Sequence, residues 1–338
     1  MSATTVPADS LWDRVRGYSP PPRYLPVIAT LALLIGMFAI GGVRYEGFSD
    51  PQVVLSLLID NAFLIVLAVG MTFVILTGGI DLSVGSVVAL STMIAAKTLQ
   101  LGWPPYLSMA AVLATGTLLG LLMGLLIHYF DIQPFIATLA GLFLARGLTY
   151  LISVESISIN DPTFTKLAFK TVTFGDYYLR WTAIIALLVV AIAAYVLART
   201  RFGRTVYAIG GNRQSAQLMG LNTSRVRVSV YAISGLCAAL AGLLLAVQKL
   251  SGYSLNGIGL ELDTIAAAVI GGVLLSGGVG FVLGSVIGVL VLGTIQTFVT
   301  AENLDSYWTR IMTGLLLLGF VLVQRALARN SLREASKR

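Results

Sequence analysis

The sequence predicts an all-α, polytopic membrane protein with about ten transmembrane helices in two related halves. Three observations support this fold class: composition, apolar windows that recur along the chain, and an internal repeat. Of the 338 residues, 57% are hydrophobic and only 11% are Asp, Glu, Lys or Arg. A soluble protein carries about a quarter charged residues because its surface faces water. The composition therefore excludes a water-soluble globule.

Ten apolar windows are long enough to serve as spans, since a hydrocarbon core about 30 Å thick needs about 20 residues per helix. The predicted spans are residues 24–43, 55–76, 83–99, 105–128, 134–153, 179–198, 228–248, 262–277, 279–300 and 307–325. Segment 1–23 lacks the apolar core and cleavage site of a signal peptide. We therefore expect a cytoplasmic segment 1–23, a membrane domain 24–325 and a cytoplasmic tail 326–338.

The distribution of basic residues predicts the orientation. Most of the 22 Lys and Arg fall in segment 1–23, in the loop 199–227 and after residue 324. With ten spans these three segments share one face, and basic loops stay on the cytoplasmic side. Both termini are therefore predicted to be cytoplasmic. The same clustering argues against nucleic-acid binding as the explanation of the net charge of +7.

Two Gly-rich motifs form the internal repeat. LTGGIDLSVGS (76–86) aligns without a gap with LSGGVGFVLGS (275–285). Each copy is expected to close one span, break at a Gly pair and open the next span. The predicted helix-break corners are Gly78, Gly79, Gly277 and Gly278. A chance likeness between Gly-rich membrane segments is the alternative explanation.

Glycines also recur every four residues in two predicted spans, which favours close helix packing. These are Gly116, Gly120 and Gly124, and Gly280, Gly284 and Gly288.

Five polar residues are candidates for a translocation pathway. Asp81 follows the first Gly pair, where it can cap the next helix or line a polar notch for a hydroxylated solute. Arg146 lies about 18 Å along its predicted helix, so its charge must reach the surface, pair with a loop acid or face a pathway. Asn61, Gln248 and Asn256 are weaker candidates, with interhelical or loop hydrogen bonding as the alternative.

The loop 199–227 is expected to hold a short helix. Asn212 can cap it, Ser215, Ala216 and Leu218 fall within it, and Gly220 can end it. Its apolar side chains among arginines fit either the membrane surface or the groove of a partner protein.

Enzymatic chemistry is not indicated. The chain has one cysteine, Cys237, and one histidine, His128, which argues against a disulfide, a zinc site or a His-containing triad. It lacks a phosphate-binding GxxxxGK[ST] loop. We therefore expect no cofactor and no metal. An ion-coupled secondary carrier remains an alternative, because such carriers also use repeats and broken helices. A channel or a scaffolding subunit is a further alternative.

Four segments resemble the permease subunits of bacterial carbohydrate ABC importers of the ribose type. These are GMTFVILTGGIDLSVGSVVALS (70–91), PFIATLAGLFLARGLTYL (134–151), RFGRTVYAIGGNRQSAQLMGL (201–221) and LDTIAAAVIGGVLLSGGVGFVLGS (262–285). VESISIN (154–160), LLSGGVG (274–280) and YWTRI (307–311) are similar to a galactofuranose importer permease.

This resemblance implies a sugar-importing permease in the bacterial inner membrane. It implies four partners: an ATPase subunit that binds ATP, a second identical or different permease chain, a periplasmic sugar-binding protein, and the lipid bilayer. Asn212, Ala216 and Gly220 match the family's coupling-loop pattern, whereas Ser215 stands where an older form of the signature has Glu. Another sugar, such as ribose or a signalling furanose, is the alternative cargo.

Overall fold

A computed structural model describes residues 24–305 and 307–335, with side chains up to residue 322. The predicted cytoplasmic segment 1–23 and residues 336–338 lie outside this part of the chain. The first half comprises helices α2 (Leu25–Arg44), α3 (Pro51–Asp60), α4 (Ala62–Leu76), α5 (Val84–Gln100), α6 (Pro105–Tyr129) and α7 (Pro134–Ile152). Strand β1 (Ile157–Ser158), helix α8 (Pro162–Phe169) and strands β2 (Thr171–Phe174) and β3 (Tyr177–Arg180) follow.

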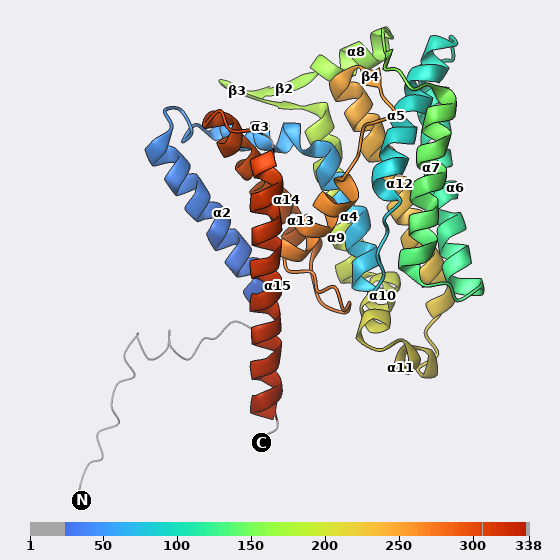
Figure 1. The fold of residues 1–338 in the computed structure, drawn as a ribbon, viewed down its shortest axis with the longest axis vertical. Helices are drawn as coiled ribbons and strands as arrows, with labels where there is room; N and C mark the ends of the chain where they lie inside the picture. The colour runs from blue at the N-terminus through green and yellow to red at the C-terminus, as the bar shows by residue number, and fades with distance from the viewer. Residues whose placement is uncertain (1–23, 306, 336–338) are drawn as a thin grey trace, which may run out of the picture.

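The second half contains helices α9 (Trp181–Arg199), α10 (Arg201–Gly211), α11 (Arg213–Leu218) and α12 (Thr223–Lys249). Strand β4 (Ser251–Gly252) leads to α13 (Leu260–Ile270), α14 (Val282–Ala301) and α15 (Tyr307–Ala335). Strand β1 pairs antiparallel with β4, and β2 pairs antiparallel with β3. Helices α10 and α11 lie at one end of the bundle, and α8 with the β2–β3 hairpin lies at the other (Figure 1).

Every predicted span contains a helix, but the helices differ in length. Within the described residues, six helices are long and apolar enough to cross a membrane: α2, α6, α7, α9, α12 and α14. Helices α3 and α4 pass the same test only when taken together, with a bend of 63° between them, which is the geometry of a broken span or a re-entrant loop. Helix α5 and the described apolar part of α15, Tyr307–Leu322, are shorter. A polytopic all-α membrane protein is therefore confirmed.

The eighth predicted span, residues 262–277, needs correction. Helix α13 ends at Ile270, and at 11 residues it is only about 16 Å long, roughly half of a bilayer core. Gly271 is its C-cap, and Gly272 has a φ of +91°. A left-handed glycine directly after the last turn is a common way to end a helix.

Helix α4 is the centre of the bundle. All of its residues except Phe63 are buried, as expected for a helix that is apolar on every side. It packs against α9, α12, α13 and α14, and α12 also packs against α5 and α6. The bundle therefore surrounds one fully enclosed helix.

Close glycine packing joins α6 to α12, as the four-residue spacing predicts. A Cβ atom on Gly120 would overlap the carbonyl oxygen of Tyr231 and approach the Cα of Gly235 to 3.0 Å. Gly116 and Gly124 face α12 in the same way. In α14, Gly284 and Gly288 pack on the α13 backbone and its C-cap, whereas Gly280 precedes the helix.

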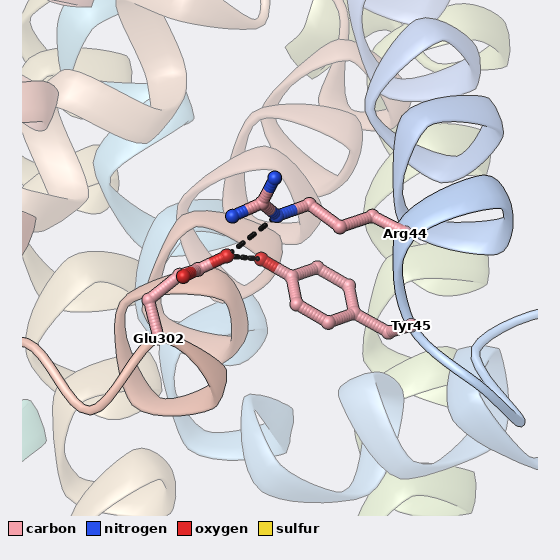
Figure 2. Close-up of polar contacts among 3 residues, drawn as sticks. All are labelled: Arg44, Tyr45 and Glu302. Atoms are coloured by element: carbon pink, nitrogen blue, oxygen red, sulfur yellow. Dashed lines mark hydrogen bonds and ion pairs between the residues drawn. The ribbon is translucent and has the colours of Figure 1, made fainter.

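Helix α2 is attached to the end of α14 by a polar contact. The Arg44 Nε atom donates to Glu302 at 2.6 Å, and the Tyr45 hydroxyl donates to the same carboxylate oxygen at 2.5 Å (Figure 2). All three side chains lie at the end where α2 and α14 terminate. This contact links the first helix of the described chain to one of the last.

Candidate coupling and translocation sites

Helix α11 is the predicted short helix of the loop 199–227. The Asn212 side-chain oxygen accepts a hydrogen bond from the Ser215 backbone N–H at 2.8 Å, which is the predicted N-cap. Gly220, with a φ of +76°, follows the helix as predicted. Ala216 is buried, whereas Leu218 is 90% exposed. The helix therefore presents an apolar side chain to the surroundings at one end of the bundle.

Helix α10 fixes α11 to both predicted corners. The backbone N–H of Gly278 donates to the carbonyl oxygen of Leu76 at 2.9 Å, which joins the two corner loops directly. Gly210 of α10 lies against this junction so closely that a Cβ atom there would overlap both partners. The Tyr207 hydroxyl donates to the Gly280 carbonyl oxygen at 2.9 Å. One short helix thus contacts the C-terminal end of α4 and the loop that precedes α14.

The two Gly-rich corners are not structurally equivalent, although their sequences align without a gap. Gly78 and Gly79 follow the end of α4, as predicted. Gly277 and Gly278 do not break a helix, because α13 has already ended at Ile270. Both still adopt left-handed φ angles, of +85° and +76°. They shape the loop that meets Gly210, which is a packing role that local sequence comparison does not reveal.

Asp81 does not cap α5, so the predicted capping role is wrong: the N-cap is Ser83, and no side chain caps the helix. One carboxylate oxygen accepts from the Ser83 N–H at 3.0 Å and from the Ser83 hydroxyl at 2.6 Å. The other accepts from the Ser234 hydroxyl of α12 at 2.7 Å. Asp81 is 1% exposed, and both oxygens are occupied. The carboxylate therefore ties the α4–α5 turn to α12, and this chain alone gives it no opening toward a solute.

Asn61 and Gln248 line one cavity of about 620 Å³ at the α3–α4 break. The Asn61 amide donates to the Leu57 carbonyl oxygen at 2.9 Å. The cavity lies between the break and the final turns of α12 and α14, and seven of its twelve lining residues are polar. The other polar residues that line it are Asp60, Lys249, Gln296, Thr297 and Thr300. None of these five was among the predicted pathway residues, although Gln296, Thr297 and Thr300 form a polar interruption at the end of an apolar helix.

Arg146 and Asn256 meet at a second place. One Arg146 Nη atom donates to the carbonyl oxygens of Ser254 and Asn256, at 2.6 and 2.9 Å. The Asn256 amide donates to the Thr92 hydroxyl at 3.4 Å. Arg146 therefore neither reaches the surface alone nor pairs directly with a loop acid. Its guanidinium satisfies backbone carbonyls of the non-helical segment before α13.

The five pathway candidates thus occupy three separate places: Asp81 in a buried turn, Asn61 and Gln248 in one cavity, and Arg146 and Asn256 beside an irregular segment. Among the residues that the structure describes, no group of three or more His, Cys, Asp or Glu is arranged to hold a metal ion. A helical bundle of spans with a broken helix, polar cavities and an exposed loop helix is the architecture expected of a membrane transport subunit.

A family model described as the permease component of branched-chain amino acid transport systems matches residues 53–321. The chain belongs to this permease family. It is 46% identical over 314 residues to the inner membrane ABC transporter permease protein YjfF of Escherichia coli (strain K12), covering 90% of this chain and 93% of that protein. No solved structure matches the chain.

Two further relatives are similar over almost their whole length. The fructose import permease protein FruG of Bifidobacterium longum (strain NCC 2705) is 40% identical, covering 96% of this chain and 97% of that protein. The ribose import permease protein RbsC of Haemophilus influenzae is 37% identical, covering 92% and 96%. These matches confirm the resemblance to ribose-type ABC permeases, and the chain is a transport subunit rather than an enzyme.

Proposed function

We propose that this chain is a permease subunit of an ATP-driven monosaccharide importer in the bacterial inner membrane, with both termini in the cytoplasm. The names of FruG and RbsC, which import fructose and ribose, support a sugar as cargo. Galactofuranose is the sugar that we expect from the motifs at residues 154–160, 274–280 and 307–311. Ribose and a signalling furanose are the alternatives.

The attachment of α10 to both corner loops is the observation that carries this proposal. An ATP-driven permease must transmit the closure of a separate ATPase to its membrane helices. Helix α11 offers exposed Leu218 at the end of the bundle, and α10 joins it to the Leu76–Gly278 junction. We expect a push on α11 to reach the end of α4 and the loop before α14 through these contacts.

The proposed complex divides the work among several chains. The ATPase subunit binds ATP and receives α11, so this chain carries no nucleotide or other cofactor. A second permease chain, identical or different, completes the pathway within the lipid bilayer. A periplasmic sugar-binding protein sits on the opposite end, where α8 and the β2–β3 hairpin lie (Figure 1). Each partner shifts the permease between two openings by binding one of them more tightly.

The polar cavity at the α3–α4 break suits the outer part of a sugar pathway. Its Asn, Gln, Asp and Thr side chains supply both donors and acceptors for sugar hydroxyls. Its volume of about 620 Å³ lies within the range of about 300–1,000 Å³ found for small-molecule sites. At the break, the Gln248 amide donates to the Asp60 carbonyl oxygen at 3.5 Å, which joins the end of α12 to the end of α3.

The test is to reconstitute the chain with its ATPase and binding protein and to measure sugar-stimulated ATP hydrolysis. We expect galactofuranose to stimulate hydrolysis, and Leu218→Asp to abolish stimulation by preventing α11 from docking. Gln214→Asp adds the same charge to an exposed position of the same helix and is the matched control. Folded components that show no stimulation with any of the three sugars would contradict the proposal.

One observation favours an ion-coupled secondary carrier instead. The Oε2 atom of Glu261 is buried without a hydrogen-bond partner in the described structure, and an unpaired acid at membrane depth is typical of ion pathways. Sugar uptake into vesicles distinguishes the two functions. Uptake that requires ATP supports the importer, whereas uptake that an ionophore abolishes and ATP does not affect supports the carrier.

A further inference from the structure

The contact between α6 and α12 brings the end of the first helix to the start of the second. Gly120 of α6 lies against Tyr231 of α12, and Gly124 lies against Val228, so the two helices run antiparallel. One further turn of α6 therefore places His128 beside the first turns of α12.

Two arginines join His128 at this place. Arg227 lies near the start of α12, and Arg213 is the first residue of α11. Both guanidinium charges act on the His128 ring, and the Arg213 charge also acts on Arg227, so the three side chains lie within electrostatic range of one another. Because like charges at this range repel one another, the cluster favours a group of opposite charge beside it.

Among the described residues, Asp131 is the one acid that acts on this cluster. Its carboxylate oxygen lies 3.7 Å from an Arg213 Nη atom, beyond hydrogen-bonding distance, and its side chain is 83% exposed. Three buried nitrogens of the cluster have no hydrogen-bond partner in the described structure: His128 Nδ1, Arg213 Nε and Arg227 Nη1. Buried polar atoms are normally paired, so these nitrogens indicate a ligand with several acceptor oxygens.

The cluster lies at the level of the lipid headgroups. Helix α6 has 25 residues and is about 37 Å long, which exceeds a hydrocarbon core of about 30 Å. Tyr129 and Phe130, next to His128, are 72% and 73% exposed, and Tyr106 near the other end of α6 is 75% exposed. Exposed aromatic rings at both ends of a span mark the two membrane–water interfaces.

We propose that His128, Arg213 and Arg227 bind a phosphate group, supplied in the membrane by the headgroup of an anionic phospholipid. A phosphate offers several acceptor oxygens and fits the planar guanidinium fork. Basic pockets between spanning helices bind anionic headgroups. Asp131 competes with the phosphate, because both are anions. Since Arg213 opens α11 while the other two residues lie in α6 and α12, a bound phosphate fixes α11 to the bundle.

Ligand retention by the full-length chain, purified in detergent, tests the site. Phosphatidylglycerol, phosphatidylcholine and inorganic phosphate are added separately over a concentration series, and bound molecules are counted by native mass spectrometry. We expect the chain to retain phosphatidylglycerol. Arg227→Gln and Arg213→Gln should each weaken its binding about fivefold or more, the effect of one basic residue at an anionic surface. Arg225→Gln removes an exposed arginine from α12 and is the matched control.

Asp131→Asn provides a test of opposite sign. Removing the competing carboxylate should tighten phosphatidylglycerol binding, a gain that a misfolded chain cannot mimic, so this variant decides the question if an arginine variant does not fold. Phosphatidylcholine should be retained weakly, because its own ammonium group neutralises its phosphate.

Binding of inorganic phosphate without retention of phosphatidylglycerol would support the phosphate site but overturn the lipid as its source. Equal retention of the two lipids would overturn the proposal. Equal phosphatidylglycerol binding by Arg227→Gln, Arg213→Gln and Arg225→Gln would also overturn it, as would an Asp131→Asn chain that binds this lipid no more tightly than the wild type.

Discussion

The backbone N–H of Gly278 donates a hydrogen bond to the carbonyl oxygen of Leu76, so the loop after α13 is joined to the end of α4. Gly210 of α10 packs directly on this bond. The junction unites the two Gly-rich motifs with the loop that carries α11. Because these contacts are made by backbone atoms in a close-packed junction, we expect them to transmit a displacement of α10 to both loops.

Adding a methyl group at Gly210 should separate α10 from the junction. In Gly210→Ala the new Cβ overlaps the Leu76 carbonyl oxygen, and overpacking of this kind costs about 1–3 kcal/mol. We expect sugar-stimulated ATP hydrolysis by the assembled importer to fall, while basal hydrolysis persists. Gly211→Ala is the control, since its Cβ meets nothing within 4 Å. Equal coupling in the two variants would contradict the role of the junction.

Removing the Tyr207 hydroxyl should loosen α10 from the α13–α14 loop. Burial raises the pKa of Tyr207 above its usual value, so the phenol stays protonated and donates to the Gly280 carbonyl oxygen throughout the physiological pH range. Tyr207→Phe should lower the free energy of unfolding by about 0.5–1.5 kcal/mol. Thermal unfolding in detergent measures this loss of stability. Tyr195→Phe is the control, because the Tyr195 side chain on α9 is exposed. An unchanged transition relative to Tyr195→Phe would exclude a stabilising bond.

Glu302 gives the attachment of α2 a defined pH dependence. Hydrogen bonds from Arg44 and Tyr45 hold the pKa of Glu302 below its usual value of 4.5 (Figure 2). A depressed carboxyl pKa contributes stability above pH 4.5 that is lost as the pH falls through the lower folded-state pKa. Thermal unfolding of the wild type and Glu302→Gln should therefore differ at pH 7 and converge in acid.

The control for this pH dependence is Glu46→Gln. The Glu46 side chain makes no hydrogen bond or ion pair within the part of the chain that the structure describes, so the variant should match the wild type at both pH values. A difference between wild type and Glu302→Gln that stays constant from pH 7 into acid would show that the ion pair contributes nothing.

Contact between α6 and α12 should tolerate no side chain at Gly120. In Gly120→Ala the methyl group overlaps the Tyr231 carbonyl oxygen and crowds Gly235, which forces apart two helices that pack through small residues. We expect a lower unfolding temperature and a lower yield of folded protein. Gly147→Ala on α7 is the matched control, because its Cβ meets nothing within 4 Å. Identical unfolding temperatures would refute the close packing.

Local sequence patterns predicted the parts of the fold that depend on local physics. Apolar windows located the spans, the Asn212 cap located α11, and the four-residue glycine spacing located the face of α6 that packs closely, although not its partner α12. The short length of α13 was missed because its apolar composition continues past Ile270, although Gly271 and Gly272 end the helix. Apolar composition shows that a segment is surrounded by lipid or by other apolar side chains. Where the helix ends depends instead on the backbone conformation of its glycines.

The candidate sites were less predictable because they depend on distant partners. Asn61 and Gln248 share a cavity only after α3, α12 and α14 have packed together. Arg146 finds its acceptors in carbonyl groups of segment 253–259, and backbone carbonyls leave no trace in a sequence. Turn-forming residues, such as Asn256, Gly257 and Gly259, were the only local signal that this segment is not helical.

The central claim is that α11 lies in the cytoplasm and docks on the ATPase. A Leu218→Cys chain with Cys237→Ala, expressed with and without the ATPase, tests it by labelling with a membrane-impermeant maleimide, because Leu218 is 90% exposed. We predict no labelling of intact spheroplasts, full labelling after permeabilisation, and protection when the ATPase is present. Labelling of intact spheroplasts, or no protection by the ATPase, would contradict the account.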